Sequence, residues 1–271
     1  MKETLPRRPF ELFLFSCDPA LIRSTVDAGV AGIVVDWERR GKRERQAGAD
    51  TQIGVDTLED LQRARAATQA RVLCRIDGFG PRTAADVDSA IAAGADEILL
   101  PMVKCREEVE AVLELARGRA GVGILVETNA AVASAAELGR LPLSRIYVGL
   151  NDLSIERRSR NLFEAIRDGT VELVRQVSRA PFGFAGLTVP DAGYPIPCRL
   201  LLGEMARIDS DFSFLRRSFH AAIRGGDPGR AVERILEAVE EARRRPLAEA
   251  RSDTLRLRDA IAAWTPGRVS A

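Results

Sequence analysis

The stretch EILLPMVKCREEVEAVLELARGRAGVGILVET (residues 97–128) contains an apolar run, a charged segment and a second apolar run. Both runs are hydrophobic nearly throughout, which is typical of strands covered on both faces. The segment between them, residues 106–118, has the periodicity of an amphipathic helix. The stretch therefore predicts a strand, a helix and a second, parallel strand.

The same alternation continues along most of the chain. Strands are expected at FELFLFS, GIVVDWE, RVLCRID, EILLPMV, VGILVET, RIYVGLN, FGFAGLTV and MARIDSD, which begin at residues 10, 32, 71, 97, 122, 145, 182 and 205. Amphipathic helices are expected between them, for example at residues 56–68, 83–94, 106–118, 130–139 and 162–179. Eight such units describe an α/β fold, the (β/α)8 TIM barrel. The competing fold is an open doubly wound sheet, but no G-x-G-x-x-G follows the first strand.

The barrel is expected to form the catalytic domain, residues 1–225, and residues 226–271 a C-terminal helical extension. Asp227 is expected to cap a helix whose first residue is Pro228. The charged tail beyond it has room for one more helix. These extra C-terminal helices are expected to pack on the barrel or on a neighbouring subunit.

Composition excludes several classes of protein. The net charge of +1 over 271 residues gives no overall attraction to nucleic acid or to an anionic membrane. No apolar run reaches the length of a transmembrane helix, and the first residues lack a signal-peptide pattern. The four cysteines are widely spaced, which fits a cytoplasmic protein better than a zinc site or a disulfide framework. The single histidine, His220, lies in a helical-looking segment that offers it no orienting partner.

The active site of such a barrel forms at the carboxyl ends of its strands. The polar residues expected there are mostly acidic: Asp36, Glu38, Asp77, Glu127, Asn151, Asp152, Asp191, Asp209 and Asp211, with Arg75 as the cation among them. Carboxylates around one opening repel one another unless a cation lies between them. Mg²⁺ typically takes one or two carboxylates and completes its shell with substrate oxygens and water.

Glu127 and Asp152 are about one βα unit apart in sequence, so consecutive strand ends could hold one ion between them. Arg75 could then bind a substrate carboxylate through two parallel hydrogen bonds. The structural alternative is that these residues only cap strand ends and form salt bridges between loops. Two other motifs are weaker: GFG (residues 78–80) reads as a turn before a helix, and YPIPC (residues 194–198) reads as a stiff loop near the opening.

At these residues the chain resembles the HpcH/HpaI aldolase and citrate lyase beta-subunit family, metal-dependent barrels related to the phosphoenolpyruvate-utilising enzymes. The segments that carry the resemblance are AGVAGIVVDWE, RVLCRID, GADEILLPMVKCREEVEAV, GILVETNAA, YVGLNDLS, GFAGLTVPDAG and RIDSDFSFLRR. It extends from about Leu12 to Ile223. The ET and G-x-x-DLS motifs, in this order and at this separation, are its most specific part.

The resemblance implies a Mg²⁺ or Mn²⁺ ion bound by Glu127 and Asp152. It also implies that Arg75 binds the carboxylate or carbonyl oxygen of the substrate, with help from the backbone N–H groups of Leu150, Asn151 and Asp152. Asp36 and Glu38 would line the same opening as further catalytic residues.

Two features depart from the family pattern, and one of them is the absence of the usual glycine a few residues after DLS, where IERRSR follows. The other concerns the catalytic base. Pyruvate-dependent aldolases of the family carry a histidine base directly after the glutamate of the second strand, and here that residue is Arg39. The base is therefore left to Glu38, Asp36 or a metal-bound water.

The sequence thus predicts a metal-dependent carbon–carbon lyase of the aldolase type, which works through a metal-stabilised enolate of a 2-oxo acid such as pyruvate or oxaloacetate. The alternative is a citrate-lyase-like or malyl-CoA-lyase-like enzyme, or a thioesterase, whose basic ERRGKRER loop (residues 38–45) would meet an acyl-CoA. A second alternative is a barrel without turnover that serves as a subunit or ligand-binding module. Relatives often share their last helix between subunits, so the resemblance also implies a homo-oligomer, a trimer or a hexamer.

Overall fold

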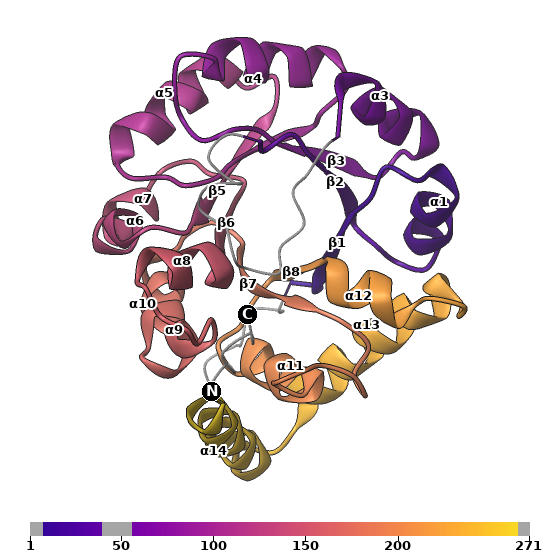
Figure 1. Ribbon diagram of the computed structural model, residues 1–271, viewed down its shortest axis with the longest axis vertical. Coiled ribbons are helices and arrows are strands. Elements are labelled where there is room, and N and C mark those ends of the chain that lie inside the picture. Colours follow the sequence, from indigo (N-terminus) through magenta and orange to yellow (C-terminus); the bar gives the residue numbers. More distant parts are fainter. Residues whose placement is uncertain (1–7, 40–55, 265–271) are drawn as a thin grey trace, which may run out of the picture.

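Eight parallel strands close into a barrel and pair in the order in which they follow one another along the chain. The computed structural model describes residues 8–39 and 56–264. Figure 1 looks down the barrel and shows the helices arranged around the strands. The predicted (β/α)8 TIM barrel with additional C-terminal helices is confirmed.

The strands are β1 (Glu11–Phe15), β2 (Gly32–Asp36), β3 (Arg71–Arg75), β4 (Glu97–Leu100), β5 (Gly121–Val126), β6 (Arg145–Val148), β7 (Phe182–Leu187) and β8 (Phe212–Leu215). The helices are α1 (Pro19–Asp27), α3 (Leu58–Ala67), α4 (Thr83–Ala92), α5 (Arg106–Ala116), α6 (Asn129–Ala133), α7 (Ala135–Leu138), α8 (Leu150–Glu156), α9 (Glu164–Arg167), α10 (Thr170–Val177), α11 (Cys198–Arg207), α12 (Arg217–Ala222), α13 (Pro228–Arg244) and α14 (Leu247–Ala263).

The prediction of the eighth strand is wrong. Residues 205–211 form the end of α11 and a turn, and the strand that closes the barrel is the next segment, β8. Met205 and Ala206 are buried because α11 is covered by β7, α13 and α14, and a short buried helical run can resemble a buried strand in its apolar residues. The other seven strands lie within their predicted runs or begin one residue before them.

Alternate strand residues fill the barrel interior in layers. The inward-facing apolar side chains form one cluster, which consists of Phe13, Val34, Leu73, Leu99, Leu125, Tyr147, Phe212 and Phe214. Nearer the amino ends of the strands, Arg145 donates from Nε and Nη2 to the two carboxylate oxygens of Glu97 at 2.5 and 2.7 Å. The guanidinium of Arg145 also lies 4.0 Å from the centroid of the Phe13 ring. The interior is therefore packed below the carboxyl end, where the polar site lies.

A second hydrophobic shell lies between the strands and the helices. Side-chain caps fix where several helices begin. Thr57 and Asp60 form a capping box at α3, and Asp227 Oδ1 accepts from the N–H of Gly229 at 2.8 Å at the start of α13. The predicted cap at Asp227, with Pro228 as the first helical residue, is confirmed. Within the described residues, no helix is long and apolar enough to cross a membrane.

The helix predicted over residues 162–179 is divided into α9 and α10. The break lies at Gly169, whose φ of 85° is accessible to glycine without steric cost. Asp168 Oδ1 accepts from the N–H of Thr170 at 2.9 Å and starts the second helix. Ala165, Val171 and Val174 are buried on both sides of the break, so the apolar periodicity alone predicted one helix.

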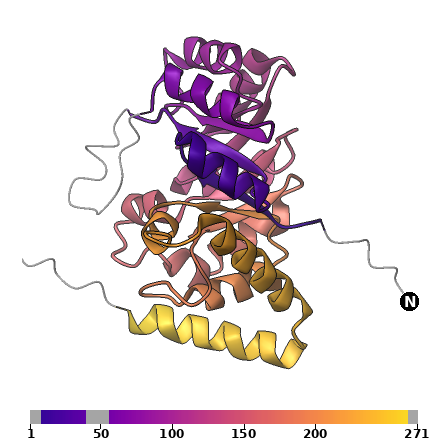
Figure 2. The ribbon, with the colours of Figure 1, turned by 90° about the vertical axis from the view of Figure 1, so that its right-hand side faces the viewer.

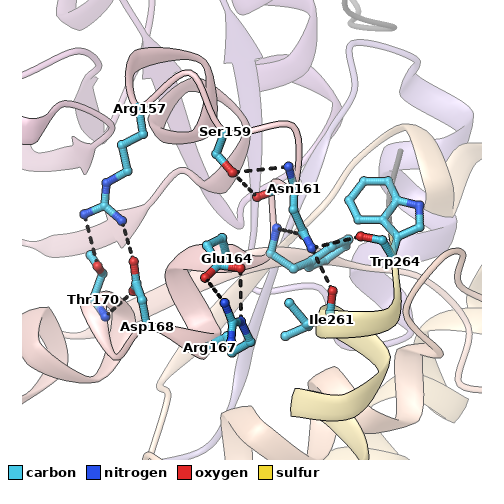
Figure 3. A network of polar contacts seen from close by, with 10 residues as sticks. Arg157, Ser159, Asn161, Glu164, Arg167, Asp168, Thr170, Ile261 and Trp264 are labelled. Atoms are coloured by element: carbon cyan, nitrogen blue, oxygen red, sulfur yellow. Dashed lines mark hydrogen bonds and ion pairs between the residues drawn. The ribbon is translucent and has the colours of Figure 1, made fainter. Parts of the chain in front are cut away.

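The C-terminal helices pack on the barrel: α13 contacts α1 and α11, and α14 contacts α11 and α9. Figure 2 shows α14, in yellow, along one edge of the molecule. Nδ2 of Asn161 donates to the carbonyl oxygens of Ile261 at 2.7 Å and Trp264 at 3.3 Å (Figure 3). The end of α14 is thereby joined to the segment that follows α8. The domain boundary at residue 225 stays a prediction.

Candidate active site

Arg75 binds two carboxylates at the carboxyl ends of β2 and β3. Its Nε and Nη2 donate to Oδ1 and Oδ2 of Asp36 at 2.8 and 2.6 Å, and its Nη1 lies 3.1 Å from Oε2 of Glu38. All three side chains are buried. Burial acts to lower the pKa of Arg75, but the charges of Asp36 and Glu38 outweigh it and raise that pKa well above its usual value. The structure thus brings these three predicted residues together.

The carboxylates of Glu127 and Asp152 lie at the same end of the barrel. Glu127 directly follows β5, and Asp152 lies in the first turn of α8, which follows the neighbouring strand β6. The two residues are only 3% and 8% exposed. Burial raises the pKa of Glu127 to about 8, and the negative charges of Asp152 and Glu38 add to the rise. Two carboxylates are therefore close enough to oppose each other's ionisation.

Gly149 allows Glu127 to lie against the start of α8. A Cβ atom at this position would be 2.3 Å from Oε1 and 2.5 Å from Cγ of Glu127, which is far inside an ordinary contact. On its other side, Oε2 of Glu127 lies 3.2 Å from the backbone nitrogen of Met102, which donates to it. The glycine of YVGLNDLS is thus required by the position of the Glu127 carboxylate.

The carboxylates of Glu127 and Asp152 fit a divalent cation. Both are buried and repel each other, and a cation between them would remove that cost. The described part of the chain contains no group of three or more His, Cys, Asp or Glu residues placed to hold a metal. An ion held by this pair would therefore take its other ligands from water and substrate, the arrangement typical of Mg²⁺.

Residues Leu150, Asn151 and Asp152 form the first turn of α8. Backbone N–H groups in a first helical turn have no partner within the helix and can bind an anion. The far end of α8 is fixed by Arg157, whose Nη1 donates to Oδ2 of Asp168 at 2.9 Å and whose Nη2 donates to Oγ1 of Thr170 at 3.0 Å (Figure 3). These contacts hold the helix that carries Asp152.

The sequence pattern did not predict two polar residues at the carboxyl end of the barrel, Tyr147 and Arg216. Tyr147 follows the inward alternation of β6, and burial raises the pKa of its hydroxyl well above the usual value. Arg216 directly follows β8, with its guanidinium 4.5 Å from the centroid of the Phe15 ring. The alternation of FSFLR places Arg216 on the inner side with Phe212 and Phe214, but the misplaced eighth strand hid this signal.

Other polar residues expected at the opening lie elsewhere. Asp191 forms an ion pair with Arg234 of α13 on the surface. Asp209 and Asp211 precede β8, so they lie at the amino end of the barrel, where Asp211 Oδ2 accepts from the N–H of Phe182 at 2.8 Å. Their expected place depended on the wrong eighth strand.

Three further sequence motifs have structural partners. Asp77 Oδ1 accepts from the N–H of Arg39 at 2.7 Å, and the Arg39 side chain donates to the carbonyl of Asp56 at 2.7 Å. Nε2 of His220 lies 2.8 Å from the carbonyl oxygen of Phe15, at the end of β1. The N–H of Gly80 donates to Oγ1 of Thr83 at 2.9 Å, which confirms a turn before α4. Residues 40–45 of the basic loop lie outside the described residues.

A family model described as HpcH/HpaI aldolase/citrate lyase matches residues 10–162, from β1 through α8. The fold is similar to an HpcH/HpaI aldolase from Desulfitobacterium hafniense, with a TM-score of 0.59 and 15% identity over 89% of this chain and 95% of that one. It is also similar to the citrate synthase SbnG, with a TM-score of 0.59 and 17% identity over 81% and 89% of the two chains.

A tryptophan synthase chain from M. tuberculosis gives a TM-score of 0.58 at 16% identity, over 86% of this chain and 93% of that one. No curated protein sequence matches this chain. At these identities the structural similarities show the barrel fold alone.

Proposed function

This chain belongs to the HpcH/HpaI aldolase/citrate lyase family, and on that premise we propose that it is a metal-dependent carbon–carbon lyase of the aldolase type. Its substrate class would be the aldol adducts of a 2-oxo acid such as pyruvate or oxaloacetate. The single observation that carries the proposal is the buried Glu127–Asp152 pair beside the cluster formed by Arg75 with Asp36 and Glu38.

Glu127 and Asp152 would hold Mg²⁺ or Mn²⁺, which when bound supplies a Lewis acid for the oxo group of the substrate. Within the described residues, Asp36 accepts hydrogen bonds from two of the five N–H donors of Arg75, and Glu38 forms an ion pair with Nη1. The N–H groups of Nη1 and the second N–H of Nη2 would therefore be available to the substrate. The N–H groups of Leu150, Asn151 and Asp152 would bind the carboxylate from the other side.

Glu38 is the base we propose. Asp36 is held by two hydrogen bonds to Arg75 and therefore acts chiefly to orient that guanidinium, whereas Glu38 meets Arg75 through Nη1. Glu38 would take the proton of the substrate hydroxyl as the carbon–carbon bond breaks. The aldehyde leaves, and the bonding electron pair stays on the 2-oxo acid as an enolate, whose negative charge Arg75 stabilises. Return of the proton to carbon completes the reaction.

Proton exchange tests this proposal without knowledge of the aldehyde. The protein is incubated with pyruvate in D₂O with Mg²⁺ or Mn²⁺, and loss of the methyl proton signal is followed by NMR. We expect metal-dependent exchange that disappears in Glu127→Ala and persists in Glu114→Ala, an exposed control on α5. Absence of exchange with any donor, together with absence of divalent-ion binding, would refute the proposal.

The same experiment separates the alternatives. Exchange with acetyl-CoA but not with pyruvate would favour the citrate-lyase-like or malyl-CoA-lyase-like enzyme. Ion binding without exchange from any donor would favour the barrel without turnover. Both alternatives are tested because Arg39 stands at the position of the family's histidine base.

A homo-oligomer, a trimer or hexamer, in the cytoplasm is also part of the proposal. Leu247 and Leu255 lie two turns apart on α14 and are 78% and 62% exposed, so they offer an apolar face to a second copy. No disulfide joins the four cysteines, all of which are described, and this fits a reducing compartment. Light scattering after gel filtration measures the oligomeric state.

A further inference from the structure

Arg216 extends an inward-facing column of β8 to the carboxyl end of the barrel. Phe212 and Phe214 both belong to the cluster inside the barrel, and Arg216 is the next residue of β8's inward-facing alternation. Its half-buried side chain therefore faces the end of the barrel where the carboxylate pair and Arg75 lie.

Arg75 and Arg216 flank one aromatic ring but differ in their partners. Their guanidinium carbons lie 5.3 and 4.5 Å from the centroid of the Phe15 ring. Arg75 is neutralised by Asp36 and Glu38. Within the described residues, Arg216 forms no ion pair and no side-chain hydrogen bond, and its guanidinium stacks over the Phe15 ring.

The environment of Arg216 is unfavourable for an unpaired cation. Burial lowers the pKa of Arg216, the positive charge of Arg75 lowers it further, and Asp36, Tyr147 and Glu127 act in the opposite direction. A cation that loses water without gaining a carboxylate destabilises the fold. A guanidinium in such a place gains most from an anion supplied by a ligand, because it can bind a carboxylate through two parallel hydrogen bonds.

We infer that Arg216 is a specificity-determining residue that binds a second carboxylate of the substrate, so that the substrate class is a 2-oxo dicarboxylic acid or its aldol adduct and not a monocarboxylate. This inference rests on the proposed function for the placement of the first carboxylate. Arg75 and the first turn of α8 take that carboxylate from the β3 and β6 sides, and Arg216 approaches from β8. The ring centroids of Tyr147 and Phe214 lie 4.4 Å apart, so the tyrosine lies beside the inward-facing residues of β8.

A matched pair of stable 2-hydroxy acids tests the inference. Malate and 2-hydroxybutyrate have the same chain length, and malate carries a carboxylate where the other acid ends in a methyl group. Binding of each is measured by calorimetry with Mn²⁺ and again without it, for wild type, Arg216→Ala, Arg216→Lys and Arg224→Ala. Arg224 is an exposed arginine on the same segment of chain and serves as the control. Circular dichroism melts confirm that each variant is folded.

We expect wild type to prefer malate by about 10- to 100-fold, the range of one charge-assisted pair of hydrogen bonds. Arg216→Ala should remove the preference, Arg216→Lys should keep part of it, and Arg224→Ala should keep all of it. Equal binding of the two acids by wild type, or a preference that survives in a folded Arg216→Ala, would overturn the inference. The two proposals can fail separately. If malate is preferred through Arg216 but Mn²⁺ does not bind, the proposed function fails and the role of Arg216 stands.

Discussion

Gly149→Ala perturbs the candidate metal site without removing a ligand. The new Cβ would lie 2.3 Å from Oε1 and 2.8 Å from Cδ of Glu127, so the carboxylate must move by about 1 Å to restore an ordinary contact. Metal ligands tolerate displacements of only about 0.2 Å. We therefore expect Mn²⁺ affinity to fall about 10- to 100-fold, and the metal-free protein to lose about 1–3 kcal/mol of unfolding free energy from overpacking.

Calorimetric titration with Mn²⁺ measures the first effect and urea denaturation the second. Gly226→Ala is the matched control, because its Cβ would come no closer than 3.8 Å to any neighbour. If the clash is with Glu127, the double variant Glu127→Ala/Gly149→Ala should be no less stable than Glu127→Ala alone. Wild-type Mn²⁺ affinity in Gly149→Ala, or full additivity of the two stability losses, would refute the reasoning.

Three further predictions concern stability. Arg75→Ala removes the buried guanidinium that pairs with Asp36 and Glu38, and urea denaturation should show a loss of about 3–5 kcal/mol; a loss below 1 kcal/mol would contradict this estimate. In metal-free protein the pKa of Glu127, raised from 4.5 to about 8, favours the folded state at low pH. The free energy of unfolding should therefore fall as the pH rises from about 4.5 to about 8, by up to about 1.4 kcal/mol per pH unit. Glu127→Gln should flatten this dependence of stability on pH. Asn161→Ala removes the hydrogen bonds to the end of α14, so amide exchange should accelerate in α14 while β5 keeps its protection; equal protection of α14 in both proteins would disprove the anchoring role.

The barrel could be predicted because most strands are separate apolar runs followed by amphipathic helices. The eighth unit could not, because the end of α11 and its C-cap bring the buried apolar residues Met205, Ala206 and Ile208 together in a short run, as a strand would. The true strand, FSFL, contains Ser213, whose Oγ donates to the carbonyl of Ala185 at 2.6 Å. The hydroxyl of Ser213 is hydrogen-bonded to the neighbouring strand β7, and the sequence of one segment cannot reveal a contact with another strand.

Part of the candidate site could be predicted because its members stand at the carboxyl ends of strands. Asp36, Arg75 and Glu127 each stand where an apolar run stops, and the barrel rule brings such ends together. Arg216 was missed because its strand was misplaced. The buried Glu97–Arg145 pair was missed for another reason: both residues begin their strands and lie far apart in sequence, so they match no rule about strand ends.

The central claim is that Glu127 and Asp152 together hold one divalent ion at the ends of β5 and β6. Mn²⁺ titration of wild type, Glu127→Gln, Asp152→Asn and Glu114→Gln, each confirmed as folded, tests it most directly. The account predicts one ion per chain in wild type and in Glu114→Gln, and no measurable binding in the other two variants. Wild-type affinity in a folded Glu127→Gln or Asp152→Asn would contradict the claim.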